Sequence, residues 1–135
     1  MTVQQFLEMR FSALMAGNYD AVYDSYHEDA PFIKQFSDRQ AYLHFARQQL
    51  TAIVIHDWRC LRQRALDGKQ LEVVLVMEVA VDDENQYFYE LALLVETDRG
   101  WCYHSAQKLA MDDYTGSPDL IDFCHFDNAN PKIRF

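Results

Sequence analysis

The sequence predicts a single α+β domain in which N-terminal helices pack on a curved antiparallel sheet of four or more strands. Three features of the 135 residues predict this class. Apolar residues recur every three or four positions up to about residue 52, and at every second position from Ile53 onward. Short turn sequences then divide residues 53–109 into strands. Helices that precede the strands, instead of alternating with them, are typical of α+β proteins.

The first helix is expected over residues 3–14. Thr2 is a suitable N-cap, and Gly17 with Asn18 supplies the left-handed stop that many helices use. The stripe that recurs at helical spacing consists of Val3, Phe6, Leu7, Arg10, Phe11 and Leu14.

Two further helices are expected before the sheet. A short one covers residues 19–26, and Pro31 ends that region because a proline disfavours helical geometry in the residue before it. The other begins behind Ser37 or Asp38 as its cap and runs to about Ala52.

Residues 53–62, 71–82, 86–97 and 101–109 read as four strands. Asp67 with Gly68, residues 83–85 and residues 98–100 are the turns between them, which predicts an antiparallel meander. After Ala110 the pattern fails: residues 120–126 form a short helix or strand, and residues 131–135 form a tail. We therefore expect a domain over residues 1–110 and a C-terminal extension, residues 111–135, packed on the same domain.

Composition disfavours several classes of partner. The chain has 12 basic and 21 acidic residues, a formal net charge of -9, which disfavours nucleic acid and membrane surfaces. Three cysteines, Cys60, Cys102 and Cys124, without a C-x-x-C pair indicate neither a disulfide framework nor a zinc knuckle. No signal peptide is recognisable, and no apolar stretch approaches the ~20 residues of a membrane span, so we expect a cytoplasmic protein.

A long twisted sheet that curls around helices leaves a cone, and its wide end is a usual place for a ligand pocket. This order of helices and strands, with Gly100, Trp101 and Tyr103 in the last strand, resembles the nuclear-transport-factor-2-like superfamily and its cystatin-like cone fold. The resemblance implies a fold and no particular reaction, because that superfamily includes isomerases, dehydratases, ligand binders and dimerisation modules.

A narrower resemblance lies near the N-terminus. Residues 9–20, MRFSALMAGNYD, followed by Tyr26 and His27, are similar to the opening of the bacterial SEC-C-associated domain. The cysteine-rich zinc motif of that family is absent, so no zinc role carries over. Glu28 stands where the family has the proline of a Trp-His-Pro sequence, and Tyr26 stands for its tryptophan.

The superfamily resemblance implies where chemistry would occur. Its isomerases and dehydratases use an Asp or His base in an apolar cavity, with Tyr as a hydrogen-bond donor. The pocket candidates here are His56, Asp57, Glu78, Tyr89, Glu90, Tyr103 and His104, with Tyr87 nearby. Strand alternation allows only one of His56 and Asp57, and one of Tyr89 and Glu90, to face inward. A solvated strand face is the alternative for each.

Other polar groups have simpler interpretations. His27, Glu28 and Asp29 are adjacent and read as a polar helix end, and Cys124 and His125 lack a partner cluster, so we expect no metal site and no cofactor. The row formed by Arg59, Arg62 and Arg64 could bind an anion, or pair with Glu72 or Glu78 across the ladder. The aromatic stripe of Phe6, Phe11, Tyr23, Tyr42 and Phe45 is expected in the helical core, and part of it could line a cavity.

These features favour a non-catalytic module, either ligand-binding or protein-interaction, with a pocket inside the curved sheet. We expect a homodimer through the outer sheet face, where residues of the Trp58 or Ile55 type would be exposed for a partner. The alternative is a cofactor-free lyase or isomerase that uses a carboxylate or His with Tyr in the pocket. The sequence favours the module over the enzyme.

Overall fold

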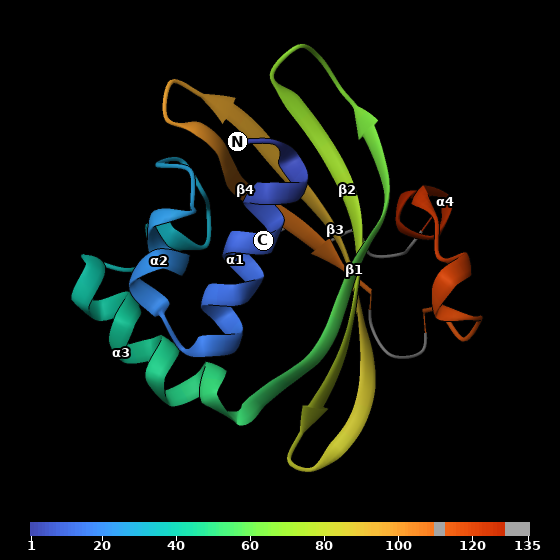
Figure 1. Ribbon diagram of the computed structural model, residues 1–135, viewed down its shortest axis with the longest axis horizontal. Coiled ribbons are helices and arrows are strands. Elements are labelled where there is room, and N and C mark those ends of the chain that lie inside the picture. The colour runs from blue at the N-terminus through green and yellow to red at the C-terminus, as the bar shows by residue number, and fades with distance from the viewer. Residues whose placement is uncertain (110–112, 129–135) are drawn as a thin grey trace.

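The computed structural model describes residues 1–109 and 113–128, and places three helices on one face of a four-stranded sheet (Figure 1). The helices are α1 (Val3–Ala16), α2 (Tyr19–Asp24) and α3 (Arg39–Gln49), with short 3-10 turns at Ile33–Gln35 and Leu50–Ala52. The predicted fold class is confirmed, because all three helices precede the strands and cover one side of a bent sheet (Figure 1).

The sheet is a simple meander. Its strands, in sequence order and in spatial order, are β1 (Ile53–Ala65), β2 (Gln70–Val81), β3 (Glu84–Thr97) and β4 (Gly100–Lys108). Every neighbouring pair is antiparallel. The turn between β2 and β3 falls at Asp82 and Asp83, earlier than the predicted residues 83–85. Both have positive φ, 51° and 66°, as a two-residue hairpin loop of mirror-image type requires.

The ends of α1 and α3 follow the predicted capping residues. Thr2 and Gln5 form a reciprocal capping box, and Gly17 ends α1 at φ 72°. Asp38, and not Ser37, caps α3 by accepting a hydrogen bond from the Ala41 amide at 2.8 Å.

The second helix is shorter than predicted. It ends at Asp24 because the next residues pair with β4 instead of continuing the helix. The Tyr103 amide donates to the Ser25 carbonyl and the His27 amide donates to the Tyr103 carbonyl, each at 2.8 Å. This short parallel bridge fixes the segment after α2 against the last strand.

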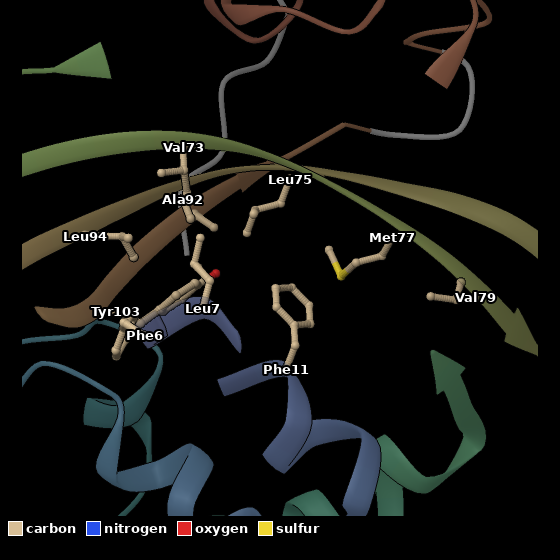
Figure 2. Close-up of a cluster of buried hydrophobic side chains, with 11 residues drawn as sticks. Phe6, Leu7, Phe11, Val73, Leu75, Met77, Val79, Ala92, Leu94 and Tyr103 are labelled. Atoms are coloured by element: carbon tan, nitrogen blue, oxygen red, sulfur yellow. The ribbon is translucent and has the colours of Figure 1, made fainter. Parts of the chain in front are cut away.

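The main core lies between α1 and the inner face of the sheet. Figure 2 shows Leu7 and Phe11 of α1 directed toward Leu75 and Met77 on β2. A second cluster fills the space among the helices and includes Val22 and the fully buried Tyr42. Burial of such apolar surface is the dominant favourable term in folding. The first cluster therefore holds α1 on the sheet, and the second holds the helices together.

Two irregularities in β1 decide which residues face this core. The pairing with β2 shifts between Ile55 and Asp57 and again between Cys60 and Arg62. Ile55 and Trp58 both pack on the inner side, and the Trp58 ring stacks on Phe11 with centroids 4.4 Å apart. The prediction that the outer face exposes residues of the Trp58 or Ile55 type was wrong for both residues. Because a bulge adds one residue to the strand, strict alternation fails across it.

The outer face of the sheet carries the chain's own C-terminal segment, residues 113–128. This segment contains a 3-10 turn (Pro118–Leu120) and the short helix α4 (Phe123–Asp127), which lies across the sheet from α1–α3 (Figure 1). Ile121 and Phe126 are fully buried there, together with outer-face residues Val74, Val76 and Leu91. The predicted tail at residues 131–135 lies outside the described residues.

Within residues 1–109 and 113–128, every helix is too short or too polar to span a bilayer.

Candidate ligand-binding cavity

A cavity of about 440 Å³ lies between the inner face of the sheet and the helices. That volume is within the range of small-molecule pockets. Its walls are mostly apolar, with Leu7, Phe11, Leu14, Val22, Phe32, Phe45, Leu50, Ile53, Ile55, Leu75, Met77, Val79, Phe88, Ala106 and Leu109 among the lining residues. The polar lining residues are Arg10, Tyr26, Tyr42, Tyr89, Glu90, Tyr103 and Lys108.

Arg10 brings a cation into this apolar space. It comes from the apolar stripe of α1 and is only 7% exposed. Its guanidinium carbon lies 3.9 Å from the ring centroid of Tyr103 and 4.6 Å from that of Tyr26, so aromatic faces hold the charge. It also donates hydrogen bonds to the Ser25 hydroxyl and, at 3.3 Å, to the Tyr26 hydroxyl.

Arg10 remains charged in this position. Burial lowers the pKa of its guanidinium, but Tyr26, Tyr103 and Glu90 together outweigh burial and raise that pKa above its ordinary value. The cavity therefore contains a permanent positive charge.

Glu90 and Tyr103 form the second polar feature of the cavity. Both are buried, and the Tyr103 hydroxyl donates a hydrogen bond to Oε1 of Glu90. Burial, with the Glu90 charge next in size, raises the pKa of Tyr103 well above its ordinary value. The phenol consequently stays protonated and serves as a donor.

Tyr42 is the third. Its side chain is 1% exposed, and its hydroxyl has no hydrogen bond with any other described residue. The described part of the chain also contains no fully enclosed side-chain nitrogen or oxygen without a partner. The Tyr42 hydroxyl therefore opens onto the cavity that this residue lines. Burial, reinforced by Tyr26 and opposed by Arg10, raises the pKa of this phenol.

The seven pocket candidates divide between the two sides of the sheet. Glu90 and Tyr103 line the cavity and are joined by their hydrogen bond. Tyr89 reaches the lining, but its ring packs edge-on against Tyr114 in the outer cluster, with centroids 5.1 Å apart. Of the pair formed by Tyr89 and Glu90, Glu90 is thus the residue that faces inward.

The other four candidates lie outside the cavity lining. His56, Asp57 and Glu78 are exposed. The first bulge of β1 explains why neither His56 nor Asp57 faces inward, whereas alternation alone would have turned one of them to the core. His104 is half-buried; its ring lies 5.7 Å from that of His27 and its Nδ1 is 2.9 Å from the Ser105 hydroxyl.

The arginine row of β1 binds the C-terminal segment. Arg59 pairs with Asp119, and Arg62 pairs with Asp122 at 3.3 Å. Arg64 makes two parallel hydrogen bonds to Asp127, at 3.0 and 2.9 Å, and one to the buried Glu72 at 2.9 Å. Of the two cross-ladder partners considered, Glu72 is the one used; Glu78 is paired in register with Asp57.

In the part of the chain that the structure describes, His, Cys, Asp and Glu side chains do not gather in groups of three or more able to hold a metal ion. Cys124 is exposed, and its sulfur lies 3.9 Å from Nδ1 of His125. Nδ1 of His125 itself accepts from the Asp122 amide at 2.9 Å as part of the cap of α4. This pair therefore belongs to a helix start.

Sequence reasoning did not select Arg10, Tyr26 or Tyr42 as site residues. The available signal for Arg10 was its position within an otherwise apolar helical stripe, since a charged residue there must be buried with partners. Tyr42 belonged to the aromatic stripe, part of which does line the cavity. Tyr26 gave no local signal, because the bridge to Tyr103 that positions it joins distant parts of the chain.

Of the comparisons with known proteins, the one with solved structures bears on the fold. No family model and no curated protein matches this chain. Among solved structures it is similar to a domain of unknown function with a cystatin-like fold from Nostoc punctiforme, with a TM-score of 0.61 and 13% identity. The match covers 82% of this chain and 77% of the Nostoc chain. At this identity the likeness concerns the backbone arrangement, and the chain therefore has the cystatin-like α+β fold.

Proposed function

We propose that this protein is a non-catalytic ligand-binding module that holds a small, mainly apolar molecule inside its curved sheet. The supporting observation is the cavity of about 440 Å³, whose walls are apolar except for a few convergent polar groups. A pocket of this composition is the usual form of a small-molecule site. We also propose that this module belongs to the nuclear-transport-factor-2-like superfamily, close to the SEC-C-associated domain that residues 9–20 resemble.

Titration with Nile red, a neutral dye that fluoresces in apolar surroundings, tests the proposal. We expect saturable binding by the wild-type chain. Ala106→Phe should weaken it about tenfold or more, because Ala106 is buried on the cavity wall and a ring there takes up ligand space. Ala65→Phe, at an exposed position on β1, is the matched control. Equal dye binding by both folded variants would place the dye elsewhere and contradict the proposal.

A cofactor-free lyase or isomerase is the second candidate, and the pair formed by Glu90 and Tyr103 favours it. Glu90 would accept a proton from the ligand. Tyr103 already donates to Glu90, so the Tyr42 hydroxyl, which has no partner among the described residues, is the group available for a developing oxyanion. Deuterium exchange into small ketone probes in D₂O, seen with wild type and lost in Glu90→Gln, would favour the enzyme. Probes recovered without deuterium support the module.

The homodimer through the outer sheet face and the cytoplasmic location stay predictions. On that face residues 113–128 already cover Val74, Val76 and Leu91, so a second copy would have to use the surface they leave. Sedimentation of the full chain at micromolar concentration tests the dimer, and a monomer would contradict it.

A further inference from the structure

The guanidinium of Arg10 has hydrogen-bonding capacity that the described residues do not use. It carries five N–H groups, and two of them donate to the hydroxyls of Ser25 and Tyr26. The other three have no acceptor among residues 1–109 and 113–128, and none of the ion pairs found in those ranges involves Arg10. A buried cation is rare and costly without a close anion, and the Glu90 charge acts on Arg10 from beyond salt-bridge distance.

Tyr42 adds a second unused donor to the same cavity. Its hydroxyl opens onto the cavity without a partner among residues 1–109 and 113–128, and Arg10 is among the groups whose charge acts on its pKa. Two donors of different chemistry, both more than nine-tenths buried, are thus available to one bound group. The group that satisfies them must be an acceptor.

The charges on the cavity wall suggest the charge of that acceptor. Arg10 and Lys108 are the cations that line the cavity and Glu90 is its one carboxylate among the described residues, so the lining has one net positive charge. The whole chain has a net charge of -9, so this local excess is opposite in sign to the rest of the protein. The Glu90 carboxylate, which accepts a hydrogen bond from Tyr103, would repel the second negative charge of a dianionic ligand. A monoanion is therefore favoured over a phosphate dianion.

The shape of the donors narrows the choice further. The planar guanidinium fork matches a carboxylate, which can accept two parallel N–H bonds. Beyond the polar groups the wall is aliphatic and aromatic, with Met77 and Phe88 opposite the helices. We infer that the cavity binds a monocarboxylic acid with an apolar body, its carboxylate held by Arg10 and Tyr42. This inference rests on the proposed binding function and specifies its ligand class.

A matched pair of probes tests the inference. Decanoate and decan-1-ol share a chain and differ in the head group, and each is titrated against bound Nile red. We expect decanoate to displace the dye at about one tenth of the concentration that decan-1-ol requires, or below, because hydrogen bonds to a charged group are stronger than those to a neutral one. Tyr42→Phe should reduce this preference severalfold, and Arg10→Gln should abolish it.

Control variants and control outcomes separate the carboxylate inference from the proposed binding function. Tyr23→Phe removes a phenol hydroxyl outside the cavity lining, so the decanoate preference should be unchanged. If Arg10→Gln does not fold, Tyr42→Phe still tests the inference, because the Tyr42 hydroxyl has no hydrogen-bond partner in the described part of the chain. Equal displacement by acid and alcohol overturns the carboxylate inference while the binding module stands. Absence of saturable dye binding contradicts the binding module itself.

Discussion

Tyr42 and Tyr103 are both buried phenols, but their hydroxyls differ in what they contact. Tyr103 donates to the buried Glu90, whereas the Tyr42 hydroxyl has no partner in the described structure. Removing one partner of a buried hydrogen bond leaves the other unsatisfied, and costs ~1–3 kcal/mol. We therefore expect Tyr103→Phe to lower the free energy of unfolding by that amount. Tyr42→Phe should change it by less than about 0.5 kcal/mol. Urea unfolding of both variants is the measurement, and equal losses would contradict the assignment.

The raised pKa of Tyr103 predicts how the free energy of unfolding depends on pH in the alkaline range. Burial raises the pKa of Tyr103 well above the ordinary 10.0. The folded chain then keeps a proton that the unfolded chain releases, so the contribution is complete below the unfolded pKa and is lost as pH rises beyond it. We expect the free energy of unfolding to fall between about pH 10 and pH 11. The fall should be shallower in Tyr103→Phe, by up to ~1.4 kcal/mol per pH unit. Identical slopes in urea titrations would show that Tyr103 ionises equally in both states.

At the scale of elements, the arginine row of β1 determines how the C-terminal segment attaches. Arg64 bonds both the buried Glu72 and Asp127, and its guanidinium lies 4.3 Å from the Phe123 ring centroid. Asp127 and Glu72 also hold the pKa of Arg64 above its ordinary value, with the Asp127 hydrogen bond the largest contribution and burial opposing it. Arg59 pairs with Asp119, and both of these side chains are exposed.

This difference gives a matched prediction. Arg64→Gln should cost ~1–3 kcal/mol, because the buried Glu72 loses a charged partner. Arg59→Gln should cost less than about 1 kcal/mol, as exposed ion pairs do. Amide hydrogen exchange across residues 113–128 reports the local effect, and should accelerate in Arg64→Gln only. Acceleration in Arg59→Gln alone would show that the exposed pair is the attachment.

For the whole molecule, the C-terminal segment decides which apolar surface meets solvent. Ile121 and Phe126 are fully buried against Val74, Val76 and Leu91. Replacing both Ile121 and Phe126 by Asp should release the segment and expose the outer face. Exposed apolar patches of that kind drive association. We expect the double variant to sediment as larger species than wild type at the same concentration. Unchanged sedimentation would contradict this expectation if amide hydrogen exchange shows that the segment is detached in the double variant.

Local sequence patterns predicted the α+β class, but they did not predict which face of the sheet each strand residue occupies. Alternation correctly separates Tyr89 from Glu90, because β3 is regular where it pairs with β2. In β1 it fails at His56 and Asp57, since a bulge there turns both side chains to solvent. A bulge depends on pairing with the next strand, and single-strand periodicity contains no record of it.

The sequence by itself determined the order of helices and strands, the capping residue Thr2, the choice of Ser37 or Asp38 as the cap of α3, and the antiparallel meander. These depend on contacts between residues close along the chain, where spacing and turn chemistry act directly. Only the tertiary structure assembled the cavity, because Arg10, Tyr42 and Glu90 come from α1, α3 and β3 and meet through packing. It also decided that residues 113–128 cover the outer face, since that depends on long-range apolar burial and pairing with the arginine row.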